Sequence, residues 1–465
     1  MIDRTQHGRS LAYGSVFVGV VVAAVGSLGA PLITSVATSF DVPLSSAQWT
    51  LTLTLLIGAV ATPILGRLGS GPHRRGAILA ALTVVAAGGI VTTLPLSFAW
   101  LLVGRGAQGV GLALTSMLMG VARGHLPEAR ANSTIASLSV ASTVGVGIGY
   151  PLSGLLADVG GIRMAYGIGA ALTILALVVA WMIVPVASHD RSGSLDVPGA
   201  LLLATFLSVL LLLVSDTSLW TTHPAAAAVL AVVAGVAAAA WIVVQLASAS
   251  PLVDLRLFRH GAVVGANAAM FLGGIGMYLL LTLITRYAQT PAGAGYGFGL
   301  SAFGAGSVLI PFSLFGFFAG RIAPRAARRM RPAHAVTASA LVVLVALAVF
   351  AVDRTGVVEL CVAMAVLGFG VGSFSATMPA VVLSAVPDEE TSSAMSVNQV
   401  VRSVGFAVGS AVGGLVLAAG TPNTGTFPSD EAYTIAAFYG MAAVFAAAIV
   451  SASVLHGRAI AGHPT

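Results

Sequence analysis

The chain has 465 residues, of which 57% are hydrophobic and only 8% are charged. A soluble domain carries about 25% charged residues, so a water-soluble enzyme or binding module is excluded and an all-α polytopic membrane protein is indicated. The net charge of +6 comes from arginines scattered between apolar runs, with no lysine and no basic face, and it does not indicate nucleic-acid binding.

Fourteen apolar runs follow one another along the chain, each long enough for one membrane-spanning helix of about 20 residues. The first run is too long for a signal-peptide core and lacks a clean small-x-small cleavage site, so we expect it to remain as the first span. The runs cover about residues 12–34, 46–65, 77–95, 99–122, 133–157, 164–186, 197–215, 224–247, 263–286, 300–322, 333–351, 356–380, 393–419 and 432–456.

The arginines indicate the orientation of these spans. All but Arg105, Arg163, Arg286, Arg354 and Arg402 fall in the termini or in the loops after even-numbered runs. Basic residues concentrate in cytoplasmic loops. We therefore predict that both termini are cytoplasmic and that the protein is a multi-pass component of the plasma membrane.

A glycine- and arginine-rich loop joins the second and third runs, with Gly66, Arg67, Arg74 and Arg75 as its prominent members. Its arginines can reach helix C-termini and lipid phosphates. Positive charge that simply anchors a cytoplasmic loop is the alternative interpretation. A second copy at residues 320–329 favours a functional role, because topology requires the charge but not the repeated spacing.

Arg105 and Gln108 lie within the fourth run, about two turns from its outer end. A buried arginine in a span costs at least ~2.5–3.5 kcal/mol, and an intramembrane ionisable residue is a functional candidate by default. The alternative is an arginine that extends to the membrane interface. We predict that Arg105 and Gln108 line a substrate or proton pathway.

The fifth run contains the Gly-rich sequence Gly-Val-Gly-Ile-Gly-Tyr-Pro-Leu-Ser-Gly. Its residues Gly145, Gly149, Pro151 and Gly154 would destabilise a soluble helix, but a bilayer tolerates them because small side chains allow close helix packing. We predict a packing seam through the glycines and a bend at Pro151.

An internal repeat relates the two ends of the chain, because Gly405, Gly409 and Gly414 of the thirteenth run match the glycines of the fifth. Repeats in membrane proteins indicate transporter halves around a site near the membrane midplane. We predict an N-terminal six-helix half at 1–186 and a C-terminal six-helix half at 256–465. The segment 187–255 between them is predicted to hold two extra peripheral helices.

Asn398, Gln399 and Arg402 form a polar group early in the thirteenth run. Asn398 and Arg402 are four residues apart and share a helix face. They could line the same cavity as Arg105, or they could act as polar contacts between helices. We include all three in the predicted substrate or proton pathway.

No cofactor or metal site is predicted. The Gly-rich stretches lie inside spans, and without lysine there is no Gly-Lys-Ser/Thr phosphate loop. No His or Cys cluster has metal-ligand spacing, and the single Cys361 is interpreted as a small core residue. An enzyme is therefore not indicated, and an ion or substrate gradient must supply the energy.

These motifs resemble those of the major facilitator superfamily. The loop at 66–75 is similar to motif A, residues 105–111 to motif B (Arg-x-x-Gln-Gly) and residues 145–154 to motif C. Motif C, the two central extra helices and the sequence at 251–258 resemble the fourteen-span drug:proton antiporter branch.

The resemblance implies the major facilitator fold, alternating access and export of a hydrophobic small molecule in exchange for protons. It implies that Arg105 assists proton transfer. It implies a bend of the fifth span at Gly145, Gly149, Pro151 and Gly154, and a cytoplasmic latch at Gly66, Arg67, Arg74 and Arg75.

The chain departs from the family pattern in three places, and the missing acids among them motivate an alternative. Ser70 stands where motif A has Asp, the first span has no acid, and motif C reads Gly-Tyr-Pro in place of Gly-Pro. The alternative is an exporter or facilitator of an endogenous metabolite or lipid-like anion with weak or no proton coupling. A receptor or scaffold is a third possibility, which the absence of a sizeable soluble segment disfavours. We expect a monomer whose partners are the bilayer, a small substrate and the proton.

Overall fold

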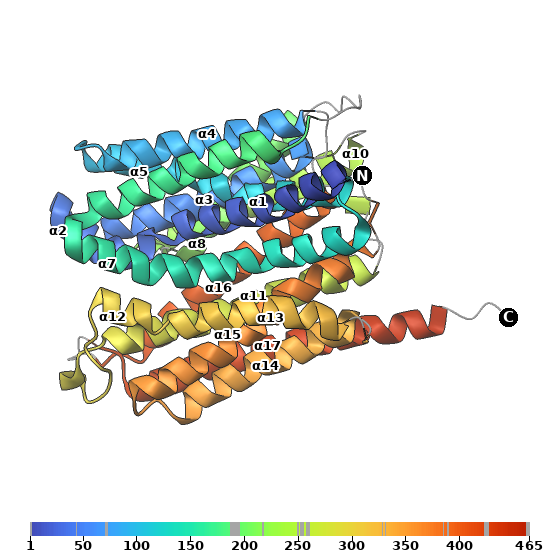
Figure 1. Cartoon of the computed structure of the whole chain (residues 1–465). Helices are drawn as coiled ribbons and strands as arrows, with labels where there is room; N and C mark the ends of the chain where they lie inside the picture. Colours follow the sequence, from blue (N-terminus) through green and yellow to red (C-terminus); the bar gives the residue numbers. More distant parts are fainter. Residues whose placement is uncertain are drawn as a thin grey trace. The chain divides into compact units, whose positions relative to one another are not determined.

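A computed structural model describes the chain as a set of α-helices (Figure 1). It describes all residues except 1, 43, 70–72, 187–195, 216–217, 249–250, 252–254, 257–260, 328, 331, 385, 388–389, 423–426 and 462–465. The helices are α1 (Ile2–Ser27), α2 (Gly29–Phe40), α3 (Leu44–Gly69), α4 (Arg74–Thr93), α5 (Phe98–Gly109), the 3-10 helix η1 (Val110–Ala113), α6 (Leu114–His125), α7 (Glu128–Ile183), α8 (Val197–Ser215), α9 (Ser218–Thr222), α10 (Pro224–Ala247), α11 (Gly261–Gln289), η3 (Ala292–Ala294), α12 (Ala302–Ser307), α13 (Ile310–Ala327), α14 (Pro332–Val352), α15 (Val357–Leu383), α16 (Thr391–Ala419) and α17 (Asp430–Ala461).

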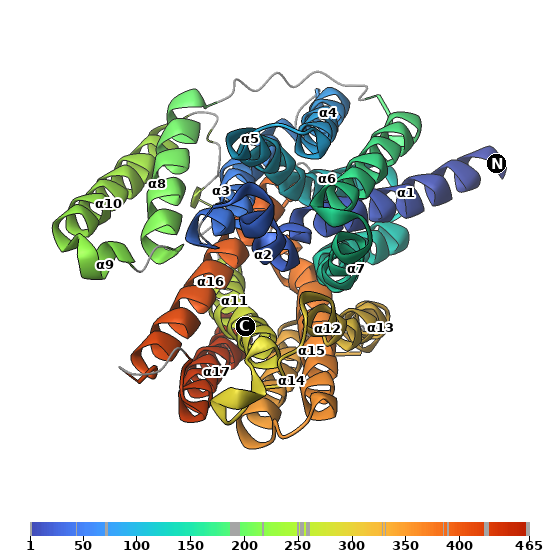
Figure 2. The ribbon, with the colours of Figure 1, turned by 90° about the vertical axis from the view of Figure 1, so that its left-hand side faces the viewer.

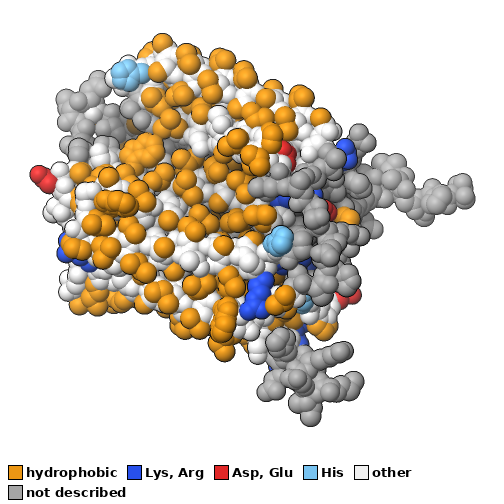
Figure 3. All heavy atoms as spheres, turned by 90° about the horizontal axis from the view of Figure 1, so that it is seen from above, with side chains coloured by type: hydrophobic (Ala, Val, Ile, Leu, Met, Phe, Trp, Pro, Cys, Tyr) orange, Lys and Arg blue, Asp and Glu red, His pale blue; other side chains and the backbone are white. Residues whose placement is uncertain are grey.

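Twelve of the described helical segments are long and apolar enough to cross a membrane. A bilayer core needs about 20 apolar residues in helical form, since only a helix or a closed barrel satisfies its own backbone hydrogen bonds in lipid. On the face seen in Figure 3, hydrophobic side chains are spread over the described surface and few charged side chains lie among them. The predicted all-helical membrane architecture is therefore confirmed.

Helix α7 is longer than any single predicted run, because it joins the fifth and sixth runs through a turn of two glycines. Gly160 has φ −137° and ψ 16°, and Gly161 has φ 71° and ψ −179°. A positive φ of this kind favours glycine, which has no Cβ to clash. The chain thus reverses at Gly160–Gly161 and α7 consists of two limbs.

The first predicted run is interrupted between α1 and α2, at Leu28. Pro31 lies three residues beyond the break, and a proline has no backbone N–H to continue the helical hydrogen bonds of the preceding turn. The Leu28 amide still donates to the Ala24 carbonyl at 3.1 Å, which closes the last turn of α1. One apolar run therefore forms two helices.

The chain divides into two compact units. The first contains residues 1–210, 228–256 and 386–400, and the second contains residues 211–227, 257–385 and 401–465. Within the first unit, α1 packs along α7, and α4 packs against α5 and α7. Within the second, α15 packs against α13 and α14, and α17 packs against α11 and α14. The predicted boundaries at 186 and 256 stay predictions.

Helices α8 and α10 follow one another in the chain, with the short α9 between them (Figure 2). Asp196 begins the pair by accepting a hydrogen bond from the Gly199 amide at 2.9 Å, as an N-cap does. The same carboxylate accepts from the buried Gln245 side chain at 2.7 Å. One acid therefore connects the start of α8 to the end of α10.

Candidate functional site

Arg105 in α5 is fully buried, with 0% of its side chain exposed. Its Nη1 donates to the Gln108 side-chain oxygen at 2.6 Å and to the Val25 carbonyl at 3.2 Å. Its Nη2 donates to the Gly26 carbonyl and its Nε to the Thr50 carbonyl, both at 3.2 Å. One guanidinium thus connects α1, α3 and α5.

The position of Arg105 is explained by the break that ends α1. The last carbonyls of a helix have no intrahelical donor and carry the negative end of its dipole. Val25 and Gly26 are two such residues, and the arginine supplies both the donors and the positive charge. A Cβ built on Gly29 would lie 2.6 Å from Arg105 Nη2, so a larger residue at this position would displace the guanidinium.

Hydroxyl and aromatic groups complete the surroundings of Arg105. Thr54 donates to the Arg105 carbonyl at 2.9 Å, and Gln108 donates to the Thr92 hydroxyl at 3.5 Å. The guanidinium carbon lies 5.7 Å from the centre of the Tyr166 ring, and the buried Tyr166 hydroxyl has no hydrogen-bond partner among the described residues. No described carboxylate forms an ion pair with Arg105.

A seam of small residues joins α1 to the first limb of α7. A Cβ built on Gly145 would lie 2.6 Å from the Ala23 Cβ and 2.8 Å from the Ala24 amide nitrogen. At Gly149 it would overlap the Ser27 hydroxyl. Ser27 itself donates to the Ala24 carbonyl at 2.7 Å. The glycines therefore let two helix backbones approach closely.

Pro151 and Gly154 lie beyond this seam, the first half-buried and the second buried. The backbone stays helical through Pro151, and within α7 only Gly160 and Gly161 depart from helical angles. The bend predicted at Pro151 stays a prediction, and the pronounced change of direction lies at the two later glycines.

An equivalent seam joins α16 to α11 in the second unit. A Cβ on Gly405 would lie 2.5 Å from the Phe271 carbonyl oxygen, and one on Gly409 would overlap the Ile275 carbonyl oxygen. A Cβ on Gly414 would meet nothing within 4 Å. Two of the three repeated glycines therefore serve close packing.

The arginines of the glycine-rich loop contact helix ends and one acid. Arg74 donates to the Gly69 carbonyl at 2.6 Å, where α3 ends, and Arg75 donates to the Trp181 carbonyl at 2.8 Å, in the last turn of α7. Arg67 pairs with Glu390 at 3.2 Å. Gly66 is buried in the last turn of α3, and Ser70 lies outside the described residues.

The polar group of α16 falls into two parts. Asn398 and Gln399 are buried and belong to the first unit, whereas Arg402 belongs to the second. Arg402 is half-buried, and its guanidinium carbon lies 5.6 Å from the centre of the Phe406 ring. A cavity shared by Arg402 and Arg105 stays a prediction.

A charged cluster that the sequence did not indicate lies in the second unit. Arg354, after α14, donates from Nε and Nη2 to the two Asp430 carboxylate oxygens at 2.8 and 2.7 Å. The guanidinium also lies near the faces of Tyr287 and Phe350, with 5.6 and 5.5 Å to the ring centres. This cluster connects the ends of α11 and α14 to the start of α17.

The residues around Arg105 were also missed, namely Thr50, Thr54, Thr92 and Tyr166. Thr50 and Thr54 are four apart in an otherwise apolar run, so their shared helix face was a readable sign of a polar neighbour. Nothing local distinguishes Tyr166, because its contact with Arg105 depends on the tertiary fold.

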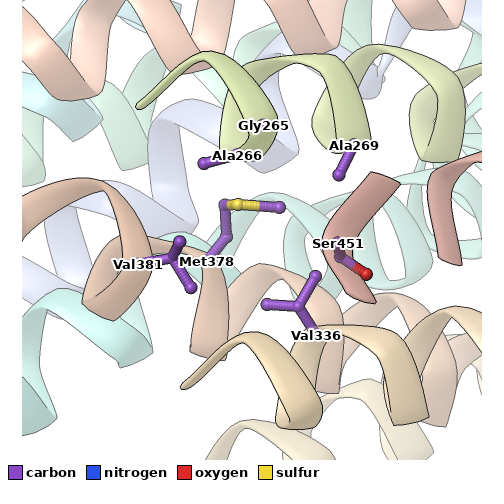
Figure 4. A pocket seen from close by; sticks show the side chains of 7 residues that line it. All are labelled: Gly265, Ala266, Ala269, Val336, Met378, Val381 and Ser451. Carbon is purple, nitrogen blue, oxygen red and sulfur yellow. The ribbon is translucent and has the colours of Figure 1, made fainter. Parts of the chain in front are cut away.

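A small cavity in the second unit is lined by residues from four helices (Figure 4). Its volume is about 10 Å³, roughly the space that one water molecule needs. The Met378 side chain projects among the other lining residues (Figure 4). Pockets for drug-sized ligands measure about 300–1,000 Å³, so this cavity is too small to be a substrate site. The lining residues are Gly265, Ala266, Ala269, Val336, Met378, Val381 and Ser451.

Comparison with known proteins agrees with this architecture. The model of the Major Facilitator Superfamily matches residues 15–351 and 291–460. The chain is 27% identical over 393 residues to the Multidrug resistance protein Stp of Mycobacterium tuberculosis, covering 82% of this chain and 70% of that protein. It is 23% identical over 384 residues to the Lincomycin resistance protein LmrB of Listeria monocytogenes, covering 82% of this chain and 80% of that protein.

A solved structure shares the fold. The crystal structure of the human organic anion transporter MFSD10 (TETRAN) superimposes with a TM-score of 0.65 and 15% sequence identity, covering 95% of this chain and 99% of that one. At this level of identity the similarity concerns the fold alone.

Proposed function

This chain belongs to the major facilitator superfamily of membrane transporters, and on that premise we propose that it exports hydrophobic small molecules, such as drugs and other toxic compounds, from the cell. The observation that carries the proposal is the similarity, over 82% of the chain, to relatives named for multidrug resistance and lincomycin resistance. The protein is a transporter and not an enzyme.

We propose fourteen spans, arranged as two six-helix halves with α8 and α10 as extra helices. The turn at Gly160–Gly161 supports counting α7 as two spans. The apolar helix Val197–Leu210 supports α8 as a further one. An even number of spans and the arginine distribution support cytoplasmic termini in the plasma membrane. A reporter fused after Thr465 should be active only in the cytoplasm.

Transport is proposed to follow alternating access with proton coupling. In this mechanism the Arg105–Gln108 pair acts at the α1–α2 break, where any rearrangement of the first span must exchange the hydrogen bonds to Val25 and Gly26. The two glycine seams allow helices to slide at close range. The protein acts as a monomer.

An uncoupled exporter or facilitator of a metabolite or lipid-like anion is the second candidate. It is favoured by the absence of any Asp or Glu deep in a predicted span. Proton coupling needs an ionisable group inside the membrane, and arginines suit a neutral or anionic substrate.

The test is efflux of a panel of fluorescent dyes from cells that lack their own drug pumps. Wild type should lower dye accumulation, an uncoupler should abolish this effect, and Arg105→Ala should weaken it at equal abundance in the membrane. Equal efflux by both proteins, insensitive to the uncoupler, would contradict the proton-coupled mechanism. In liposomes, proton flux on addition of substrate would exclude the uncoupled alternative.

A further inference from the structure

Three side chains of the second unit form a continuous stack, which we call the aromatic stack: Tyr278 of α11 with Phe406 and Arg402 of α16. The Tyr278 and Phe406 rings lie 5.1 Å apart at an interplanar angle of 21°. The Arg402 guanidinium carbon lies 5.6 Å from the centre of the Phe406 ring. All three side chains are half-buried, so each keeps some accessible surface.

Glycine packing brings the members of the stack together. Arg402 and Phe406 are four residues apart and share a face of α16. Gly274, one turn before Tyr278, is the point of contact: a Cβ there would lie 3.3 Å from the Arg402 carbonyl and 3.4 Å from the Phe406 ring. The missing side chain thus lets α11 approach α16, and Tyr278 reaches the Phe406 ring.

Arg402 lies deep in its span. It is eleven residues after the start of α16 (Thr391–Ala419), and a rise of 1.5 Å per residue places it roughly 16 Å along the helix. An arginine at such a depth faces protein or a water-filled path, because exposure to lipid is costly. Neither α11 nor α16 contains an acidic residue, so no carboxylate of these two helices neutralises Arg402.

We propose that the aromatic stack binds the substrate, and that it selects planar aromatic compounds that carry a carboxylate or sulfonate group. The inference rests on the proposed transport function and names the substrate class of that transporter. The substrate ring packs against the accessible surfaces of Phe406 and Tyr278. Its anionic group accepts hydrogen bonds from the Arg402 guanidinium, which matches a carboxylate or sulfonate geometrically.

The chemistry predicts a preference of measurable size. A ring–ring contact contributes about two- to tenfold in affinity, and a desolvated charge contact contributes about tenfold or more. A compound with the same ring and a positive group gains the first contribution and loses the second. The preference for the anion over the cation should therefore be about tenfold.

The test uses the full-length protein in nanodiscs and two probes with one ring system, pyrenesulfonate and pyrenemethylammonium. Probe binding is measured by fluorescence and corrected with empty nanodiscs. Wild type should bind the sulfonate about tenfold more tightly. Arg402→Gln should remove the preference, and Arg402→Lys should retain it. Phe406→Leu should weaken the binding of both probes about two- to tenfold.

A matched control separates this site from general effects of charge or folding. Arg321 forms a similar contact in the same unit, with its guanidinium carbon 3.6 Å from the centre of the Phe317 ring. Arg321→Gln should leave binding unchanged. Equal affinity of wild type for the two probes, or an unchanged preference in Arg402→Gln, would overturn the proposal.

Failure of this inference is distinguishable from failure of the proposed function. If wild type exports neutral or cationic dyes from cells but shows no preference for the anionic probe, the transporter function stands and the substrate class is wrong. If wild type exports no dye of any charge, the proposed efflux function fails. A preference for pyrenesulfonate that depends on Arg402 would still support the binding site in that case.

Discussion

The seam between α1 and α7 predicts that alanine at Gly145 destabilises the protein, although alanine is the better helix former. The added Cβ would lie 2.6 Å from the Ala23 Cβ and 2.8 Å from the Ala24 amide nitrogen, whereas carbon atoms in contact prefer about 3.5–4.0 Å. The two backbones must therefore separate by about 1 Å. Overpacking of this kind costs about 1–3 kcal/mol.

Gly414→Ala is the matched control, because it makes the same substitution in a helix where a Cβ meets nothing within 4 Å. Replacing glycine by alanine in a helix gains about 1 kcal/mol, and this gain is common to both variants. The difference between the two free energies of unfolding therefore isolates the packing cost. We expect Gly145→Ala to be about 1–3 kcal/mol less stable than Gly414→Ala.

The measurement is unfolding of each purified variant by SDS titrated into mixed micelles, followed by tryptophan fluorescence. Dye efflux by the same variants reports the functional effect, and we expect Gly145→Ala to be the slower exporter. If both substitutions change the free energy of unfolding by the same amount, the glycine is not needed for close packing and the reasoning fails.

Three further predictions follow from the contacts described above. Arg105→Lys should lose most of the efflux activity, and Arg105→Gln should lose at least as much. Neither side chain can reach the Val25, Gly26 and Thr50 carbonyls together. Wild-type efflux by Arg105→Lys would show that a positive charge alone suffices. The side chains of Arg67 and Glu390 are 22% and 30% exposed. A double-mutant cycle on the free energy of unfolding should therefore give a coupling between them of only about 0.2–1 kcal/mol. Exchanging the two residues should restore this coupling. Burial, followed by the proximity of Tyr433, raises the pKa of Tyr296 from 10.0 to about 12. The stability that the neutral phenol contributes is complete below pH 10 and is lost as the pH rises toward 12. The difference in free energy of unfolding between wild type and Tyr296→Phe should therefore shrink over that interval, and a constant difference would contradict the assignment.

The membrane class and the superfamily were predictable from the sequence because hydropathy and repeated motifs are local properties of the chain. Most of the long helices overlap one apolar run for the same reason. The division of the first run at Leu28 was not predicted. Pro31 is the visible cause of that break, but the arginine that caps the resulting end lies about 80 residues away.

The candidate site was predictable only in its polar members. Arg105 and Gln108 are conspicuous because ionisable and amide side chains are rare inside spans. Their partners are mainly backbone carbonyls, which every residue has, so no residue type indicates which ones are used. Tyr278 and Phe406 are likewise ordinary aromatic residues in apolar runs, and only the packing of α11 on α16 shows that they stack.

The two-glycine turn of α7 limits how far its two limbs can move apart. Consecutive Cα atoms are 3.8 Å apart, so the Cα atoms of Val159 and Ile162 cannot separate by more than about 11 Å in any state of the protein. Near the turn, a displacement of one limb by more than this distance must therefore carry the other limb with it. The amplitude of the transport cycle at this end of α7 has a geometric upper bound, which distance measurements between labels on the two limbs can read directly.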